Sequence, residues 1–269
     1  MDDFEDAPSA EEFRCAVILP SFNSGSMLEK TVQLVVALWR DIFVVVDGST
    51  DGSEHGVREA GGEGLRLLVR ERNGGKGQAV LDAVRALAGE GFTHAIVMDA
   101  DGQHPCEAIP EFVEAARQSP GAMILGVPVF GEDAPSERVH GRRVGNFFAE
   151  VETLWGGVRD SLFGFRLYPI GPFLRVMERT RCGRRYDFDT EIAVRLFWEG
   201  VRPVNRPVRV FYPPKAEGGV THFRYVRDNL LLAWTHVRLC VEMLPRIGRV
   251  ARLSYQWRSI ENSSSLSRG

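Results

Sequence analysis

The stretch IVMDADGQHP, residues 96–105, joins an apolar run to two carboxylates one residue apart. The run is followed by turn formers, which is typical of a buried strand. In α/β sheets ligands bind at the carboxyl ends of strands, where this pair emerges. If the strand continues, Asp99 and Asp101 lie on one side of its pleat. Such carboxylates repel each other and favour Mg²⁺ or Mn²⁺, although two acids in a loop could also be simple turn residues.

Similar apolar runs alternate with amphipathic stretches through the first half of the chain. The pattern predicts strands at Cys15–Leu19, Ile42–Val46, Leu65–Val69, His94–Met98 and Ala122–Val127. It predicts helices at about 27–39, 77–89 and 107–117. This alternation indicates an α/β fold, with a mostly parallel central sheet and helices on both faces.

The second half has a less regular pattern. It predicts helices at Arg142–Trp155, Asp189–Glu199 and Tyr225–Leu244, and short strands at Ser161–Pro169 and Arg209–Tyr212. One face of the last helix is apolar and carries Leu230, Ala233, Trp234, Val237, Val241 and Leu244. The segment 202–258 has eleven basic residues against three acids, which suits phosphates or anionic lipid head groups. A solvated basic face, or an amphipathic helix that packs on the protein or dimerises, would give the same pattern.

Composition limits the class of protein. The chain has 269 residues, 44% of them hydrophobic, which is enough for one large α/β domain or two small ones. A formal net charge of −3 gives no sign of nucleic-acid binding. The four cysteines form no CxxC pair, as expected in a reducing cytosol. No apolar segment reaches the ~20 residues of a membrane span, and the acidic start lacks the apolar core of a signal peptide.

These patterns predict four segments along the chain. They are a disordered acidic tail at 1–12, the α/β domain at 13–215, a basic amphipathic helical extension at 216–258 and a disordered polar tail at 259–269. We expect a cytoplasmic protein, which the extension could hold on the inner face of the membrane.

Two further strand ends carry residues suited to a nucleotide ligand. VVVDGSTDGS, residues 44–53, places Asp47 at the end of a strand and before a turn whose N–H groups could meet a base or ribose. In the alternative interpretation this is a plain corner in which Asp51 caps the next helix. NGGKG, residues 73–77, could bring Lys76 to a phosphate or simply begin a helix, and it matches neither a P-loop nor a dinucleotide fingerprint.

Together these motifs resemble the family 2 glycosyltransferases, which have the GT-A fold. The matching stretches are VILPSFN (17–23), VVVDGSTDGS (44–53), NGGKGQAV (73–80), VMDADGQHP (97–105), DSLFGFRLYP (160–169) and YDFDTEIAVRLFWEG (186–200). The nearest branch is the dolichol-phosphate mannose synthase type, whose metal motif also reads Asp-x-Asp-x-Gln-His. The resemblance covers about residues 14–212 and implies an inverting transfer from a nucleotide-diphosphate-sugar donor.

The resemblance also implies roles for individual residues. Asp99, Asp101 and Gln103 match the positions that bind the metal and the diphosphate. The donor-binding positions correspond to Pro20, Ser21, Asn23, Asp47, Lys76 and Asp99. A bound Mg²⁺ or Mn²⁺ would neutralise the leaving diphosphate as a Lewis acid.

An inverting transfer to a hydroxyl needs a general base opposite the leaving group. In many relatives this base is an acid six residues before an arginine, so Asp189, six residues before Arg195, is the catalytic candidate. Asp187 and Glu191 are the fallbacks. A lipid-phosphate acceptor is already anionic, and Asp189 would then orient it instead. Asp189 could also be a helix N-cap, a structural role compatible with either function.

Residues expected at the acceptor or diphosphate lie in three other segments. The lipid-phosphate branch commonly has Ser-Arg after Leu125-Gly126, whereas this chain has Val127-Pro128, so Arg138, Arg142 or Arg143 could replace that arginine. This stretch could also be a lid or a plain surface loop.

The motif at 160–166 matches the branch's Asp-x-x-Ser-Gly-Phe-Arg. The match implies that Gly164 admits the acceptor and that Asp160 caps the acceptor pocket, although a strand with a glycine bulge is an alternative for Gly164. His222 could close over the diphosphate or be a structural histidine.

The sequence therefore predicts a metal-dependent inverting glycosyltransferase at the cytosolic face of the membrane. Its partners would be a nucleotide-sugar donor and a polyprenyl-phosphate, lipid or other amphiphilic acceptor, with an anionic membrane surface and a second copy of the chain as further candidates. One alternative, a sugar-phosphate nucleotidyltransferase, would need a glycine- and arginine-rich loop where this chain has Ser-Phe-Asn-Ser (21–24). The other, an inactive glycosyltransferase-like binding module, is suggested by Ser24 and Val46, which replace acids of the family pattern, and is opposed by the retained metal motif.

Overall fold

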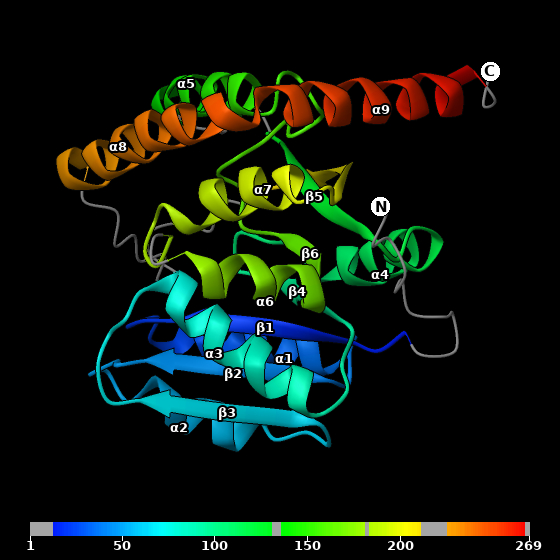
Figure 1. Ribbon diagram of the computed structural model, residues 1–269. Coiled ribbons are helices and arrows are strands. Elements are labelled where there is room, and N and C mark those ends of the chain that lie inside the picture. The colour runs from blue at the N-terminus through cyan, green and yellow to red at the C-terminus, as the bar shows by residue number, and fades with distance from the viewer. Residues whose placement is uncertain (1–12, 131–135, 181–182, 211–224, 267–269) are drawn as a thin grey trace.

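The computed structural model describes residues 13–130, 136–180, 183–210 and 225–266 (Figure 1). Its centre is a seven-stranded sheet in the order β3-β2-β1-β4-β6-β5-β7. The strands are β1 Cys15–Ser21, β2 Ile42–Asp47, β3 Leu65–Arg70, β4 His94–Val97, β5 Ala122–Val129, β6 Arg166–Pro169 and β7 Arg202–Arg209. β6 runs antiparallel between β4 and β5, and the other neighbouring pairs are parallel. The predicted mostly parallel sheet is confirmed.

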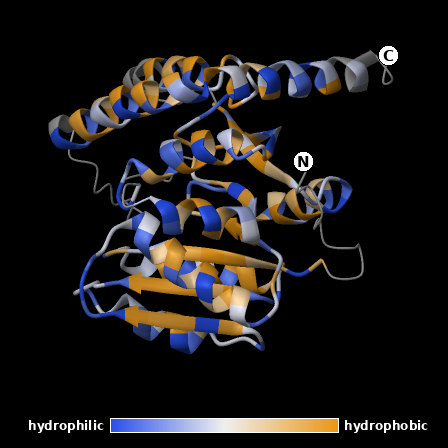
Figure 2. Ribbon diagram, in the orientation of Figure 1, coloured by the Kyte–Doolittle hydropathy of each residue, from blue (hydrophilic) through white to orange (hydrophobic). Residues whose placement is uncertain are grey.

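The central strands form because they are continuous apolar runs. β1 and β2 are buried almost throughout, as expected for strands covered on both faces. Ile18 of β1 pairs with Phe43 of β2 on one side and with Val97 of β4 on the other. Figure 2 shows the strands of the sheet as its hydrophobic centre.

The chain order of the strands creates a reversal point in the sheet. From β1 the chain moves outward to β2 and β3, and it then returns to place β4 on the other side of β1. The loops that follow β1 and β4 therefore begin side by side at the carboxyl edge of the sheet. Ligands of open α/β sheets bind at such a reversal point.

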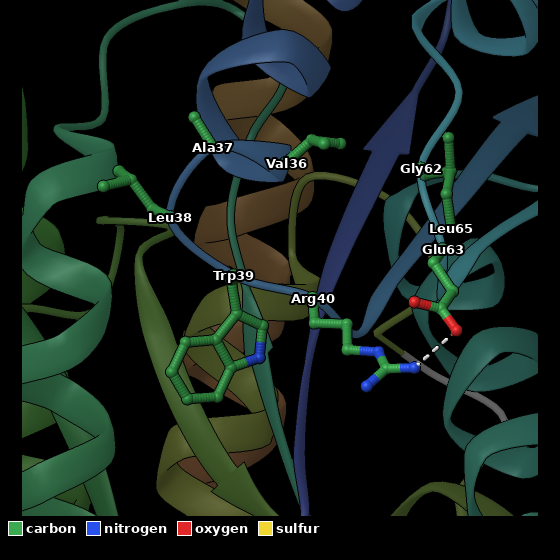
Figure 3. Close-up of a pocket in the computed structure, with 8 residues that line it drawn as sticks. All are labelled: Val36, Ala37, Leu38, Trp39, Arg40, Gly62, Glu63 and Leu65. Atoms are coloured by element: carbon green, nitrogen blue, oxygen red, sulfur yellow. Dashed lines mark ion pairs between the residues drawn. The ribbon is translucent and has the colours of Figure 1, made fainter.

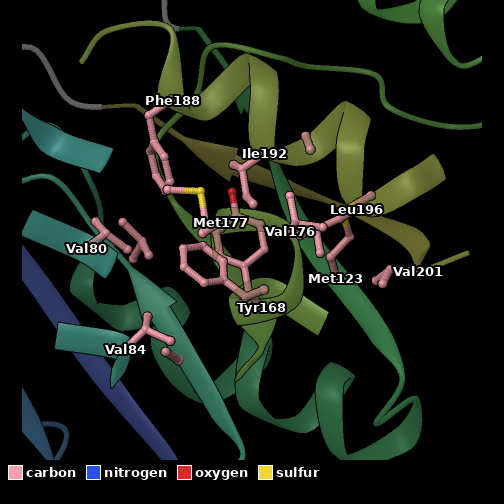
Figure 4. Close-up of a cluster of buried hydrophobic side chains, with 14 of the residues drawn as sticks. Val80, Val84, Met123, Tyr168, Val176, Met177, Phe188, Ile192, Leu196 and Val201 are labelled. Carbon is pink, nitrogen blue, oxygen red and sulfur yellow. The ribbon is translucent and has the colours of Figure 1, made fainter. Parts of the chain in front are cut away.

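Helices cover both faces of the sheet. One face carries α1 Ser26–Val36, α2 Ser53–Ala60 and α4 Ile109–Gln118, and the other carries α3 Lys76–Gly89, α6 Ile170–Arg179 and α7 Phe188–Trp198. A short 3-10 turn, Cys106–Ala108, leads into α4. Each face has its own hydrophobic core, because side chains alternate along a strand. Figure 4 shows the core under α3, α6 and α7, where Tyr168 of β6 lies near Val176 and Met177.

Three helices form an outer layer over α7 (Figure 1). They are α5 Ser136–Glu152, α8 Tyr225–Met243 and α9 Ile247–Leu266, with a 3-10 turn, Leu244–Arg246, between the last two. α5 packs against α8, and α9 packs against α7. Leu239 and Met243 of α8 and Val250 and Leu253 of α9 are buried and join the core under α7. Among the described residues, none of the helices has both the length and the apolar content that a bilayer crossing requires.

Two predicted strands differ from the structure. The strand expected at Ser161–Pro169 is limited to β6, because residues 161–163 turn around the carboxylate of Asp160, which accepts two backbone hydrogen bonds there. Of the strand expected at Arg209–Tyr212, Arg209 is the last residue of β7 and Val210 lies beyond it, and the other two residues lie outside the described residues. β7 pairs with β5 at the edge of the sheet and contains prolines, which an edge strand tolerates and a pattern search penalises.

The expected segment boundaries are tested only in part. The disordered polar tail expected at 259–269 is wrong up to Leu266, because α9 continues to that residue. Glu261 forms an ion pair with Arg159 and connects this end of α9 to the loop between α5 and β6. The acidic tail at 1–12 lies outside the described residues. The division between 13–215 and 216–258 stays a prediction, since residues 211–224 are also outside them.

Candidate active site

The acid turn, defined here as residues 99–104, lies at the carboxyl end of β4. The strand ends at Val97, so the two acids do not share a pleat. Instead Asp101 Oδ1 accepts a hydrogen bond from the backbone N–H of Gln103 at 3.0 Å, and the N–H of Asp99 donates to His104 Nδ1 at 3.1 Å. The turn and the metal-site interpretations are therefore compatible, because a tight turn holds both carboxylates in one place.

Lys76 joins the acid turn to the second half of the chain. It is the first residue of α3, and its Nζ lies 2.7 Å from Asp99 Oδ1 and 2.7 Å from Asp189 Oδ2. Asp189 lies in the first turn of α7. Three residues that the sequence analysis selected independently therefore form one cluster around an ammonium group, which we call the Lys76 cluster.

The glycine loop at 73–77 makes this approach possible. Gly75 has a φ of 91°, and a Cβ there would lie 2.9 Å from Arg185 Cγ. The N–H of Gly77 donates to the carbonyl of Arg184 at 3.0 Å. The loop thus packs directly on the segment before α7, and a side chain at Gly75 would push the two apart.

Gly164 leaves room for the Lys76 cluster. A Cβ at this position would lie 2.6 Å from Lys76 Nζ and closer still to Asp99 Oδ2. Even alanine would therefore have to displace one of the charged partners. The expected entry of an acceptor beside Gly164 stays a prediction.

Burial and charge shift the pKa values of the turn in different directions. Burial alone would raise the pKa of Asp99, but Lys76 and His104 hold it below its usual value. Burial raises the pKa of Asp101, and repulsion from Asp99 adds to the rise. Burial lowers the pKa of His104, which keeps the imidazole neutral so that its Nδ1 can accept the hydrogen bond from Asp99. A cation placed beside Asp101 would relieve the repulsion between the two acids.

A buried arginine that the sequence analysis did not select supports Asp189. Arg166 begins β6 and is completely buried. Its guanidinium donates to the backbone carbonyls of Asp160, Phe163 and Asp189, and so fixes the loop before β6 to the first turn of α7. The signal was an arginine at the start of an apolar strand, which needs buried acceptors.

Asp160 fixes α5 to the same loop. Its side chain is 2% exposed and accepts hydrogen bonds from Arg142 at 2.7 Å and from Asn146 at 3.1 Å. Arg142 is thereby placed beside the loop that carries Gly164. Whether either residue meets an acceptor phosphate stays a prediction.

Asp47 lies buried at the carboxyl end of β2. Its carboxylate accepts hydrogen bonds from the backbone N–H groups of Gly74 at 3.0 Å and Gly75 at 2.8 Å, and it forms an ion pair with Arg70. Asp47 therefore holds the glycine loop in place. Its expected contact with a base or ribose stays a prediction.

The loop after β1 is joined to the loop after β2. Asn23 has a φ of 48°, its Oδ1 accepts a hydrogen bond from the N–H of Thr50 at 2.8 Å, and its own N–H donates to Ser49 Oγ at 3.0 Å. Ser21 is buried and Pro20 is partly buried at the end of β1. These expected donor contacts thus lie beside the reversal point, where Asn23 shapes the loop itself.

Asp189 differs from its two fallbacks in having an unpaired carboxylate oxygen. Its Oδ1 is buried and has no hydrogen-bond partner among the described residues. Asp187 accepts hydrogen bonds from two backbone N–H groups and is the N-cap residue of α7, so the N-cap role expected for Asp189 is wrong. Glu191 is paired with two arginines. Of the three acids, Asp189 is the one with an acceptor atom left for a ligand.

The donor set suits a divalent cation that binds together with a diphosphate. Within the described part of the chain, no group of three or more His, Cys, Asp or Glu side chains could hold a metal. Mg²⁺ is commonly held by one or two carboxylates together with substrate phosphates. Asp99 and Asp101 supply two carboxylates and Gln103 lies on the same turn, while burial and, to a lesser extent, the neighbouring Asp99 raise the pKa of Asp101.

Two expected site residues cannot be compared with the structure. His222 lies outside the described residues, and Arg138 belongs to α5 but its side chain is outside them too.

A separate hollow of about 330 Å³ lies between residues 36–40 and the turn before β3 (Figure 3). It is at the amino ends of β2 and β3, the edge opposite the acid turn, and its ion pair between Arg40 and Glu63 is exposed. It is therefore not part of the candidate active site.

The strand order and the position of the acid turn at the reversal point fit the class that the sequence motifs predicted, a protein of the GT-A fold. The crystal structure of M. tuberculosis glucosyl-3-phosphoglycerate synthase matches with a TM-score of 0.63 over 86% of this chain and 82% of that chain, at 18% identity. The expected GT-A fold is thereby confirmed. The sequence profile of Glycosyl transferase family 2 matches residues 16–176, and the chain belongs to this family. It is a glycosyltransferase, as the sequence motifs predicted, and the nucleotidyltransferase alternative is wrong.

Curated relatives include enzymes named for polyprenyl phosphates. The undecaprenyl-phosphate mannosyltransferase of Micrococcus luteus is 25% identical over 248 residues, which are 84% of this chain and 98% of that protein. The dolichol-phosphate mannosyltransferase of Mycosarcoma maydis is 33% identical over 113 residues, which are 38% of this chain. The chain matches only 37% of the length of the M. maydis protein.

Proposed function

We propose that the protein transfers a sugar from a nucleotide-diphosphate-sugar donor to a polyprenyl phosphate or another amphiphilic lipid acceptor at the cytosolic face of the membrane. The transfer would need Mg²⁺ or Mn²⁺ and would invert the anomeric carbon. The observation that carries the proposal is the Lys76 cluster, which brings Asp99 of the acid turn and Asp189 of α7 to the same ammonium group. The names of the M. luteus and M. maydis relatives support this acceptor class.

The donor diphosphate would lie over the acid turn. Asp99, Asp101 and Gln103 would hold the metal, which would stabilise the charge that develops on the leaving diphosphate. Lys76 would then exchange Asp99 for a phosphate oxygen, since an ammonium group pairs with either anion. Gly164 would keep the space above Asp99 and Lys76 open for this exchange.

Asp189 would act on the acceptor. Lys76 holds its Oδ2, which leaves the buried Oδ1 to accept a proton. A hydroxyl or a singly ionised phosphate would donate that proton while its oxygen attacks the anomeric carbon from the side opposite the diphosphate. A doubly ionised phosphate has no proton to give, and Asp189 would then only orient it.

A donor screen tests the proposal. UDP-, GDP- and dTDP-sugars would be compared by thermal shift with and without Mn²⁺, because a ligand at 100 times its Kd stabilises a protein by roughly 2.7 kcal/mol. The stabilising donor would then be incubated with a polyprenyl phosphate, and we expect a lipid-linked sugar of inverted configuration by NMR. Undiminished transfer in EDTA would contradict the metal requirement, and a product of retained configuration would contradict the inverting mechanism.

A further inference from the structure

The apolar face of α8 points away from the protein. Leu230, Trp234, Val237, Val241 and Leu244 recur at helical spacing, and each is between 55% and 65% exposed. We call these five residues the α8 stripe. They span fifteen residues, from α8 to the first residue of the 3-10 turn that follows it, and the fourteen steps between them correspond to about 21 Å of helix length. α8 lies at the outer surface of the molecule, in the layer farthest from β3 (Figures 1 and 2).

The opposite face of α8 is held to the protein largely by charge. Among the described side chains, Arg238 forms an ion pair with Glu191 at 2.6 Å and Glu242 with Arg195 at 2.8 Å, and His236 Nδ1 lies 2.8 Å from Glu152 Oε1 of α5. Leu239 and Met243 complete this inner face. A surface helix normally buries its apolar side and exposes its charges. α8 buries Leu239 and Met243 together with its charged groups and leaves the stripe exposed, so the stripe is available to a further apolar surface.

The following helix adds positive charge next to the stripe. Arg246 of the 3-10 turn and Arg249, Arg252 and Arg258 of α9 are exposed, and the segment 243–260 contains no acid. We call these four residues the α9 arginines. Each basic residue close to an anionic lipid surface strengthens binding by about fivefold. The apolar stripe and the basic segment follow each other along one continuous edge of the molecule (Figure 1).

We propose that the α8 stripe and the α9 arginines form one surface that binds an anionic lipid bilayer, with α8 lying in the interface. A bilayer supplies both partners that this surface requires, hydrocarbon for the stripe and phosphates for the arginines. A second copy of the chain would cover the stripe but would bring more arginines rather than anions.

The proposed surface is connected to the active site through α7. Arg238 and Glu242 of α8 pair with Glu191 and Arg195 of α7, and the first turn of that helix holds Asp189. The inference deepens the proposed function and rests on it in one respect, that a lipid-linked acceptor would be delivered from the bound bilayer to Asp189.

Vesicle flotation of the full chain tests the proposal. The probes are vesicles of phosphatidylglycerol and phosphatidylcholine, and vesicles of phosphatidylcholine alone. The variants are Trp234→Asp with Val241→Asp, and Arg249→Glu with Arg252→Glu. Matched controls are Leu34→Asp, a residue of α1 that is 57% exposed on another face, and Arg58→Glu, an exposed residue of α2. Circular dichroism would establish that each variant is folded.

We expect the wild type to float with the anionic vesicles at low salt, and each double variant to lose about tenfold or more of this binding. The Leu34 and Arg58 variants should bind like the wild type. Absence of wild-type binding would overturn the proposal, and so would a dimer in light scattering that Trp234→Asp with Val241→Asp converts to a monomer. Transfer to a short-chain acceptor in detergent separates the two claims. If vesicles bind but no donor and acceptor react, the proposed function fails and the surface stands.

Discussion

Asp47, the last residue of β2, and Asp99, which follows β4, both lie at the carboxyl end of a buried strand, yet their surroundings differ. Asp47 accepts hydrogen bonds from backbone N–H groups of the glycine loop, which are part of the fold and cannot leave. Asp99 faces the side chain of Lys76, which can turn to another partner. The comparison teaches that a buried acid with backbone donors braces the structure, whereas an acid paired with a flexible cation can receive a ligand.

The largest effect is expected at Asp99. Asp99→Asn removes the charge that pairs with Lys76 and would hold the metal, so kcat/KM should fall by about 10³-fold. Steady-state kinetics with the donor found in the screen measure this. Glu107→Gln, an exposed acid just beyond the turn, is the control and should keep wild-type activity. A kcat/KM of Asp99→Asn within tenfold of the wild-type value would contradict the assignment of Asp99 as an acid that receives a ligand.

Asp189 should be the next most sensitive position. Asp189→Asn keeps the shape but loses the proton acceptor, so transfer to a hydroxyl acceptor should fall by about 10²- to 10⁴-fold. With a doubly ionised phosphate acceptor the loss should be much smaller. Asp187→Ala serves as a comparison, because it removes hydrogen bonds to two backbone N–H groups and should lower the unfolding free energy by about 1–3 kcal/mol. Equal losses of rate in the two variants would contradict the assignment of Asp189.

Asp47 should affect stability more than chemistry. Asp47→Asn weakens the hydrogen bonds to the glycine loop and leaves Arg70 without its charge partner, so the unfolding free energy should fall by about 1–3 kcal/mol. Urea denaturation measures this loss. An unchanged midpoint of urea denaturation would mean that Asp47 does not stabilise the glycine loop.

The smallest expected effect is a gain in stability rather than a loss, and it concerns Asp101. The pKa of Asp101 is raised above its ordinary 3.8, so the folded state binds this proton more tightly than the unfolded state does. Ionised Asp101 therefore costs stability at neutral pH, and Asp101→Asn should raise Tm in EDTA at pH 7. The gain should shrink as the pH falls toward 3.8, because the wild-type carboxyl then becomes protonated as well. A lower Tm at pH 7 would contradict the cost of burying the ionised Asp101 beside Asp99.

The buried parallel strands could be predicted because each is a continuous apolar run. β7 could not be predicted from its local pattern, because Pro203, Pro207 and several polar residues interrupt the apolar run. The strand is held by its pairing with β5, which is far away in the sequence. The end of α9 was missed for a similar reason. Its last turns are polar, and their position depends on the ion pair of Glu261 with Arg159, about a hundred residues away.

The site was predicted unevenly. The family motifs selected Lys76, Asp99 and Asp189. Lys76 and Asp189 lie at the starts of helices that local patterns predict, and Asp99 lies just after a predicted strand. The structural role of Asp47 could not be predicted, because the N–H groups that it binds belong to Gly74 and Gly75, in the loop that follows β3. Arg166 was hidden as well, since its value comes from three carbonyls that only the folded chain brings together.

Lys76 gives the resting enzyme an internal counter-ion. Its ammonium group occupies the position between Asp99 and Asp189 before any substrate arrives, so a free cation must compete with a charge that is covalently tethered and therefore always present. On the proposed function, a metal that arrives already bound to a diphosphate has the advantage, because the phosphate gives Lys76 a new partner at the moment it releases Asp99. On that function, the arrangement would favour an ordered sequence in which the metal and the diphosphate bind together.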